Sequence, residues 1–125
     1  MKKPKAYIIQ RGYLVTRDGR TVDHDYSSIQ PFAECVTVLG ELAEVRRGGK
    51  TEFEVIREAL LDFCEDDFLV LSGDPIFCGY ACLVAECGTA DSHIKVLKWD
   101  RKSLSYVATA MPIPFLDDDS LADRN

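Results

Sequence analysis

The chain has 125 residues, of which 46% are hydrophobic and 29% are charged, a balance that is typical of one globular domain with a buried core. No apolar run approaches the roughly 18 residues that a membrane-spanning helix needs, and the apolar segment after the basic start is too short for the core of a signal peptide. The net charge of −6 argues against a surface that coats nucleic-acid phosphates, so we expect a cytoplasmic protein without membrane or nucleic-acid partners.

Residues 1–20 are basic and predict the start of a hairpin or meander. They carry six Lys and Arg residues against Asp18 alone. Alternating segments at 6–10 and 13–17 are followed by Asp18-Gly19, a strong turn signal, and by a short return. We expect these strands to extend an edge of the sheet with their charges in water. A contact with nucleic acid is the alternative interpretation of those charges.

The middle of the chain predicts a loop, a strand and an amphipathic helix. A loop or single helical turn at 25–31 precedes a strand at 35–39, and the polar stretch 44–50 predicts another loop. Thr51 and Glu54 form a capping box, in which the hydroxyl and the carboxylate satisfy each other's orphan amides, so a helix begins at Thr51. The predicted apolar face of this helix consists of Phe53, Ile56, Ala59, Leu60, Phe63 and Cys64.

The most informative stretch joins a strand at 68–71 to a helix at about 75–87 through the loop Ser72-Gly73-Asp74-Pro75. Asp74 can cap the helix, and Pro75 suits its first position because proline has no amide hydrogen to leave unpaired. Free amides at a helix start, next to a glycine at the carboxyl end of a strand, can also cradle a phosphate. Ser72, Gly73 and Asp74 are therefore candidate ligand-binding residues, although the Asp74 carboxylate favours capping over anion binding.

The same helix is apolar around nearly its whole circumference, because Glu86 is the only charged residue between Ile76 and Cys87. Such a helix is usually covered on both sides. We expect the sheet to cover one side and a partner chain to cover the other, which predicts a homodimer.

The C-terminal part predicts a second hairpin. Segments 93–99 and 104–109 flank a polar loop, and Trp99 can face Tyr106 across the pair. The acidic segment 117–125 has no apolar pattern, so we expect it to be a disordered tail after a single domain at 1–116.

The five cysteines are an odd number and favour a reducing compartment. Cys78 and Cys82 lie one helical turn apart and could share a metal, but the other cysteines and both histidines are scattered along the chain. We expect the thiols to be packing groups, with no metal and no cofactor.

Three patterns that imitate catalytic or phosphate sites do not complete them. Gly49-Lys50-Thr51 resembles the end of a phosphate-binding P-loop, but Glu44 stands where its first glycine belongs. His24 lies between Asp23 and Asp25, which suits proton transfer or metal binding but equally suits a polar loop. Ser72 lacks the Gly-x-Ser-x-Gly elbow of a hydrolase. No catalytic residue is predicted.

Three groups of residues form a recognisable set. They are Asp25-Tyr26-Ser27 with Phe32-Ala33-Glu34, then Leu71-Ser72-Gly73-Asp74-Pro75 with Gly79 and Ala81, then Val96-Leu97-Lys98-Trp99-Asp100-Arg101 with Tyr106. The set resembles a family of small proteins found mostly in tailed phages and prophages, over roughly residues 25–108. The chain departs from the family at Cys78, Tyr80 and Cys82, where plainer aliphatic residues are expected, and in its basic hairpin. The resemblance implies a phage context, hence the host-cell cytoplasm, and carries no activity.

These observations predict an α/β (mixed α+β) domain with a three- to five-stranded sheet, two main helices and terminal β-hairpins. The predicted function is that of a small non-enzymatic phage-type accessory or interaction protein that acts on a host or phage component, with Tyr80, Trp99 and Arg101 as candidate interaction residues. The alternative is a module that binds a nucleotide or phosphorylated metabolite with the Ser72–Pro75 loop. An acidic mimic of nucleic acid is a third hypothesis.

Overall fold

The computed structural model describes residues 3–11, 13–40, 49–89 and 92–114. Its main sheet has five strands in the order β4-β1-β5-β6-β7, of which β7 is antiparallel to β6 and the others are parallel. The strands are β1 (Lys5–Gln10), β4 (Glu34–Leu39), β5 (Phe68–Val70), β6 (His93–Asp100) and β7 (Ser105–Pro112). The predicted mixed α/β fold with a three- to five-stranded sheet and two helices is confirmed.

Strand β1, which lies between β4 and β5, is buried on both faces. Ala6, Tyr7, Ile8 and Ile9 are at most 3% exposed. Tyr7 and Ile9 belong to the core under the helices, whereas Ala6 and Ile8 belong to the core on the other face. The expectation that this strand pairs with the next segment in a meander is wrong, because β1 pairs in parallel with β4 and β5. A strand that is apolar on both faces is typical of such a covered parallel sheet.

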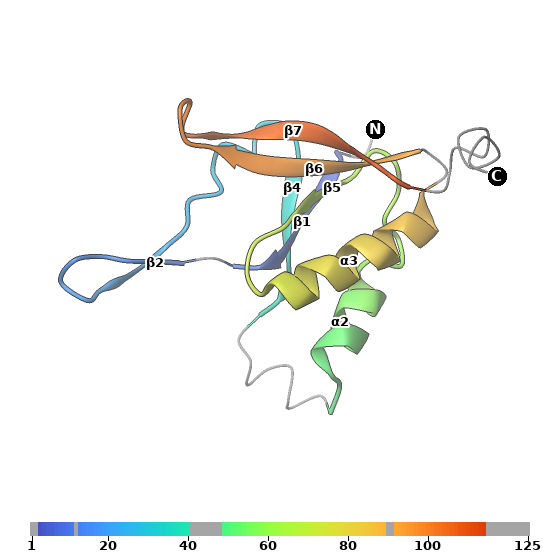
Figure 1. Ribbon diagram of the computed structural model, residues 1–125, viewed down its shortest axis with the longest axis horizontal. Coiled ribbons are helices and arrows are strands. Elements are labelled where there is room, and N and C mark those ends of the chain that lie inside the picture. Colours follow the sequence, from blue (N-terminus) through green and yellow to red (C-terminus); the bar gives the residue numbers. More distant parts are fainter. Residues whose placement is uncertain (1–2, 12, 41–48, 90–91, 115–125) are drawn as a thin grey trace, which may run out of the picture.

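Helices α2 (Glu52–Ala59) and α3 (Pro75–Gly88) lie together on one face of the sheet (Figure 1). Thr51 is the N-cap of α2, as predicted, and its hydroxyl accepts a hydrogen bond from the Glu54 amide at 3.2 Å. Two members of the predicted apolar face are exposed, namely Phe53 at 39% and Cys64. Cys64 leaves that face because α2 ends at Ala59.

The inner side of α3 is packed and its outer side is open. Cys78, Ala81 and Ala85 are buried in the core that α3 shares with the sheet, so the predicted sheet cover is confirmed. Ile76 and Leu83 are 68% and 62% exposed, so nothing in the described part of the chain covers the other side. Neither helix in the described ranges has the length and apolarity to cross a membrane.

The opposite face of the sheet is covered by the segment that leads into β4. Tyr26, Ile29 and Ala33 from this segment are buried. They pack in one cluster with Val70 of β5 and Leu97 of β6. The main sheet therefore lies between a helical layer and a layer built from an irregular segment.

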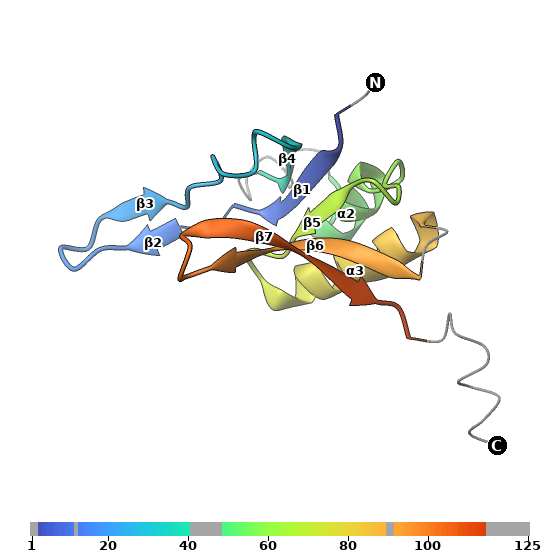
Figure 2. The ribbon, with the colours of Figure 1, turned by 90° about the horizontal axis from the view of Figure 1, so that it is seen from above.

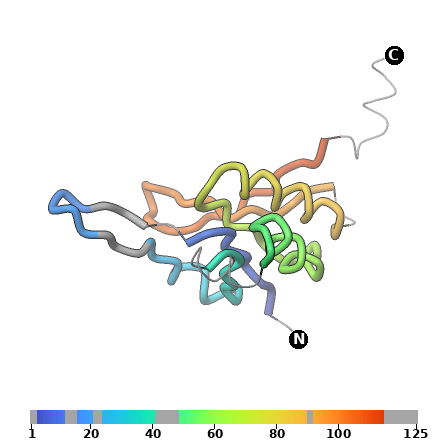
Figure 3. The backbone as a smooth tube through the Cα atoms, turned by 90° about the horizontal axis from the view of Figure 1, so that it is seen from below, coloured from blue at the N-terminus to red at the C-terminus, as the bar shows by residue number. Residues whose placement is uncertain are grey.

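The basic hairpin consists of β2 (Tyr13–Val15) and β3 (Thr21–Asp23), and the turn at Asp18-Gly19 is confirmed. The two strands form a sheet of their own, so the expectation that they extend the edge of the main sheet is wrong. Figures 2 and 3 show this hairpin projecting away from the body. The predicted tail at 117–125 and most of the predicted loop at 44–50 lie outside the described residues, and the domain boundary at 116 stays a prediction.

The N-cap of α2 gives a direct test of the helix start. Thr51→Ala removes the acceptor of the Glu54 amide and is expected to lower the free energy of unfolding by about 1 kcal/mol. Glu54→Ala is the control and should cost less, because it leaves that hydrogen bond in place. Chemical denaturation of both variants measures the difference. An unchanged midpoint for Thr51→Ala would contradict the capping role.

Candidate functional site

The carboxyl edge of the sheet carries the predicted ligand loop. In the sheet, β4 lies on one side of β1 and β5 lies on the other side. The connection from β1 leads to β4, and the connection from β4 leads back past β1 to β5, so the direction of the connections reverses between β1 and β5. Ligands of open α/β sheets bind outside the carboxyl ends of the strands at such a point. Gln10 ends β1 there, and Ser72 lies just beyond the end of β5.

Gln10 holds the loop in place. The Ser72 hydroxyl donates to the Gln10 carbonyl at 2.5 Å, and the Asp74 amide donates to Gln10 Oε1 at 2.9 Å. Gly73 between them has φ +97°, and a Cβ at this position would collide with the Gln10 side chain. Glycine is required here both by the positive φ and by the close approach. We call these contacts of Ser72, Gly73 and Asp74 with Gln10 the Gln10 clamp.

The start of α3 satisfies its own amides. The Asp74 carboxylate accepts from the Ile76 amide at 2.8 Å, which confirms that Asp74 caps the helix. Pro75 has no amide hydrogen, and the Asp74 amide is already bonded to Gln10. An anion at this point would compete with the Asp74 carboxylate for the same amides, so the loop is a poor phosphate cradle.

A cavity of about 260 Å³ opens beside the clamp, on the face of the sheet opposite the helices. The parallel register of β5 and β6 places Val70 beside Leu97. The residues just after Val70 therefore lie close to the residues just after Leu97. We call this space the aromatic cavity. It is lined by His24, Tyr26, Val70, Leu71, Ser72, Leu97, Lys98, Trp99 and Tyr106.

The rings of the aromatic cavity gather around His24. The centroid of its imidazole lies 5.1, 5.0 and 5.7 Å from those of Tyr26, Trp99 and Tyr106, each in an edge-on arrangement. Tyr26 and Tyr106 stack on each other at 5.8 Å. His24 Nε2 is buried, and none of the described residues forms a hydrogen bond with it. Burial raises the pKa of Tyr106, so this phenol stays neutral at physiological pH.

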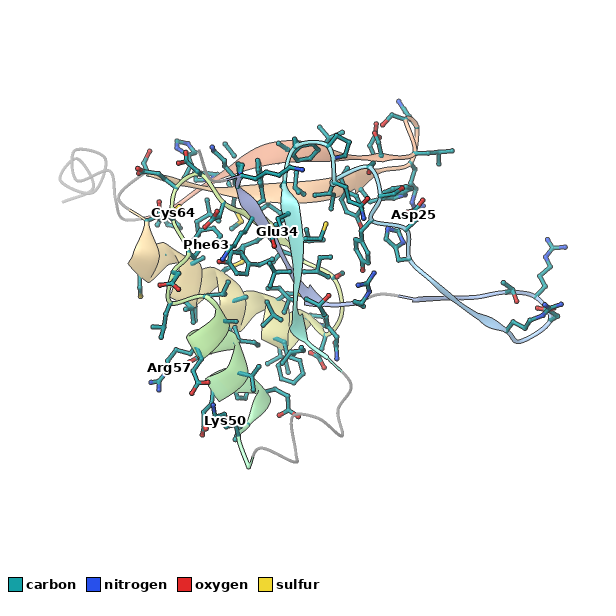
Figure 4. All side chains as sticks on the ribbon, turned by 180° about the vertical axis from the view of Figure 1, so that it is seen from behind. Asp25, Glu34, Lys50, Arg57, Phe63 and Cys64 are labelled. Atoms are coloured by element: carbon teal, nitrogen blue, oxygen red, sulfur yellow. The ribbon has the colours of Figure 1, made fainter. Side chains whose placement is uncertain are left out.

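Charged residues lie near this end of the sheet. The Arg11 guanidinium lies 5.3 Å from the Tyr26 centroid, and Lys98 is exposed in β6, where alternation puts its side chain on the face opposite that of Leu97 and Trp99. Asp25 and Asp100 use their carboxylates in local turns, since the former accepts from the Ser27 amide and the latter from the Ser103 hydroxyl. These hydrogen bonds lower the pKa of each carboxyl. Asp25 lies at this end of the molecule, far from Phe63 and Cys64 (Figure 4).

The structure separates the predicted interaction residues. Trp99 lines the aromatic cavity together with Ser72, which was predicted as a ligand-binding residue. Arg101 is exposed in the turn between β6 and β7. Tyr80 lies on α3, in the helical layer on the other side of the sheet.

Tyr80 lines a second hollow, of about 450 Å³, between α2 and α3. Leu61 and Leu83 border it and are 70% and 62% exposed. Arg57 also lines it and is exposed on the outer side of α2. We call this hollow, together with the exposed Ile76 and Gly79 on α3, the helical face.

Sequence reasoning missed Gln10, Tyr26 and Tyr106 as parts of the site, and it placed His24 in a polar loop. These residues come from separate segments and meet only because of the strand order. The only local signal was the position of Gln10 at the end of an apolar strand.

The buried thiols are packing groups on α3. Cys78 is buried and Cys82 half-buried, whereas Cys64 and Cys87 are exposed. Burial raises the pKa of Cys78 to about 11 and also raises that of Cys82. The described residues contain no group of three or more side chains placed to hold a metal ion.

Gly73→Ala tests the clamp. The added Cβ collides with Gln10 and the backbone keeps a positive φ, so the free energy of unfolding should fall by about 1 kcal/mol or more. In a Gln10→Ala background the same change should cost less, because the collision is gone. Gly79→Ala is the matched control. It meets no atom within 4 Å and should be neutral or stabilising. Equal denaturation midpoints for Gly73→Ala and Gly79→Ala would contradict the clamp.

Thiol reactivity tests the packing of α3. Cys64 and Cys87 should react first with a thiol reagent, and Cys78 should react slowly at neutral pH because its pKa is about 11. The raised pKa means that folding favours the neutral thiol, so this contribution to stability is present below pH 9.0 and is lost as the pH rises toward 11. Mass spectrometry of labelled peptides measures each rate. Stoichiometric zinc, or rapid labelling of Cys78 at neutral pH, would show that the packing account is wrong.

Comparison with known proteins agrees with the phage resemblance. Residues 4–113 match the family described as Phage Pam3 gp32-like protein, which covers all the elements of the main sheet and both helices. No curated protein and no solved structure matches the chain. Because the match covers most of its length, the chain belongs to the Phage Pam3 gp32-like protein family.

Proposed function

We propose that this phage-family protein is a non-enzymatic accessory protein that binds a host or phage protein through the helical face. The observation that carries the proposal is the open apolar outer side of α3. Leu61, Ile76 and Leu83 are each more than 60% exposed, and Leu61 and Leu83 line the hollow together with Tyr80. Apolar patches of this kind on small domains mark sites of protein association.

Gly79 supports the proposal. A glycine inside a helix destabilises it by about 1 kcal/mol relative to alanine. No described atom lies within 4 Å of the position that its Cβ would occupy, so packing within the described chain does not require glycine. Between Ile76 and Leu83 it allows the backbone of a partner helix to approach closely.

The charges around the helical face favour a basic partner. Glu54 and Glu86 are exposed on α2 and α3, and Asp62 is exposed just after α2, whereas Arg57 is the charged residue that lines the hollow itself. Glu58 is already paired with Lys50 at 2.7 Å. A partner helix with an apolar stripe and basic flanks complements this surface. A second copy would bring the same carboxylates, so the homodimer predicted from the sequence is the less favoured occupant.

The aromatic cavity lacks the arrangement of a catalytic pair, which supports a binding role. The Ser72 hydroxyl donates to the Gln10 carbonyl, and no described group forms a hydrogen bond with His24 Nε2. A nucleophilic serine instead donates to a histidine that is oriented by a third group. The alternative function, nucleotide or metabolite binding, is supported by this cavity and less by the amides of the loop.

Leu83→Glu tests the proposal by placing a charge on the helical face. Wild type, Leu83→Glu and the control Leu104→Glu, whose leucine is 70% exposed in the β6–β7 turn, are used to capture proteins from host and phage-infected lysates. We expect one protein to be captured by wild type and by the control, to be lost with Leu83→Glu, and to be released by salt because its flanks are basic.

Two results would contradict the proposal. Equal capture by Leu83→Glu and wild type would exclude the helical face as the binding surface. The second contradicting result would come from light scattering. If the wild-type mass is near twice 14.0 kDa and the mass of Leu83→Glu is that of a monomer, a second copy of the chain occupies the helical face.

A further inference from the structure

We infer that β7 pairs with β7 of a second copy of this chain, in antiparallel orientation about a two-fold axis at Thr109. The pairing joins the five-stranded sheets of the two copies into one continuous sheet. This inference goes beyond the proposed function, because it concerns the edge of the sheet and leaves the helical face free for another protein.

The outer edge of β7 is open and uncharged. β7 is the last strand of the main sheet, in which β6 is its neighbour (Figure 1). Residues 107–110 are exposed, and the strand Ser105–Pro112 contains no charged residue. Charged side chains on an edge strand are a common protection against pairing with another chain, and β7 lacks them.

Alternation along β7 leaves two residues with free backbone groups. In an antiparallel ladder, successive residues turn their amide and carbonyl alternately toward the neighbouring strand and away from it. The Tyr106 amide donates to the Ser28 hydroxyl at 3.2 Å and not to β6, so the residues that turn outward are Tyr106, Ala108, Ala110 and Pro112. Among the described residues, none forms a hydrogen bond with the outward amides of Ala108 and Ala110.

These free groups are symmetric about Thr109. With the two-fold axis at this residue, Ala108 lies opposite Ala110 of the second copy, and Ala110 lies opposite its Ala108. Each of these pairs exchanges both of its N–H···O bonds, so every free alanine amide and carbonyl is used.

The ends of the open segment obey the same symmetry. In this register Tyr106 lies opposite Pro112 of the second copy, and neither residue offers an amide. The amide of Tyr106 is bonded to Ser28, and proline has none. The strands therefore separate at these ends. A register centred on Ala108 or on Ala110 would leave an alanine carbonyl opposite a residue without a free amide.

The side chains that meet in this register are compatible. Thr109 faces Thr109 of the second copy, and threonine pairs are favourable at cross-strand positions. Val107, which is 46% exposed, faces Met111 of the second copy on the side of the sheet that carries the helices. The pairing brings no like charges together, in contrast to a second copy on the helical face.

Charges placed at the two-fold axis test the pairing. The mass of wild type, measured by light scattering from micromolar to millimolar concentration, should rise from 14.0 kDa toward twice that value. Thr109→Lys and Thr109→Glu each place like charges directly opposite one another and should weaken self-association about fivefold or more. An equimolar mixture of the two variants brings opposite charges together and should restore association. Leu83→Glu is the control and should associate as wild type does, because it alters the helical face alone.

Amide hydrogen exchange locates the contact within β7. The Ala108 and Ala110 amides should exchange more slowly as the concentration of wild type rises. The Val107 and Thr109 amides, which turn toward β6, should not change. Should a Thr109 variant fail to fold, the wild-type mass and this exchange pattern decide the question.

The inference is overturned if the wild-type mass stays at 14.0 kDa at millimolar concentration, or if the mixture of folded Thr109 variants associates no better than each variant alone. Association that is lost in Leu83→Glu would also overturn it, because the second copy would then occupy the helical face. A monomer whose Ala108 and Ala110 amides are protected at every concentration would show that another segment of the same chain covers this edge, which excludes the pairing.

Discussion

The Gln10 clamp is the contact on which the arrangement of both candidate surfaces depends. β1 lies between β4 and β5 and is buried on both faces, so its two ends are the points from which neighbouring loops can be positioned. At the carboxyl end, Gln10 binds the Ser72 hydroxyl and the Asp74 amide. At the amino end, the buried Asp67 accepts from the amides of Lys5 and Cys64. The clamp thereby sets where α3 begins and where the floor of the aromatic cavity lies.

The sheet separates two surfaces of different chemistry. On one side, α2, α3 and the turn after α2 display the exposed side chains of Leu61, Ile76 and Leu83. On the other, the segment that carries His24 and Tyr26 helps to line the aromatic cavity. The start of α3 meets the loop beside the cavity through the Cys78 thiol, which lies 3.4 Å from the Ser72 carbonyl. The helical face and the aromatic cavity therefore lie on opposite sides of the sheet.

Local features could be predicted from the sequence, because short-range chemistry determines them. Thr51 and Asp74 cap their helices as their spacing indicates, and Asp18-Gly19 makes the predicted turn. The pairing of β1 could not be predicted in this way, because alternation of side chains is the same in a hairpin and in a parallel sheet. The cavity was beyond sequence reasoning for a related cause: Gln10, His24 and Tyr106 meet through strand order and not through spacing. The open outer side of α3 agrees with the expectation that the sheet covers only one side of this helix, whereas its cover by a partner chain stays a prediction.

Amide hydrogen exchange at Asp74 tests the central role of the clamp most directly. In wild type this amide donates to Gln10 Oε1, although Asp74 itself is exposed. We expect it to be protected from exchange, and we expect Gln10→Ala to remove that protection while the Ile76 amide, which donates to Asp74, keeps its own. An Asp74 amide that exchanges in wild type as fast as in an unstructured peptide would contradict the account.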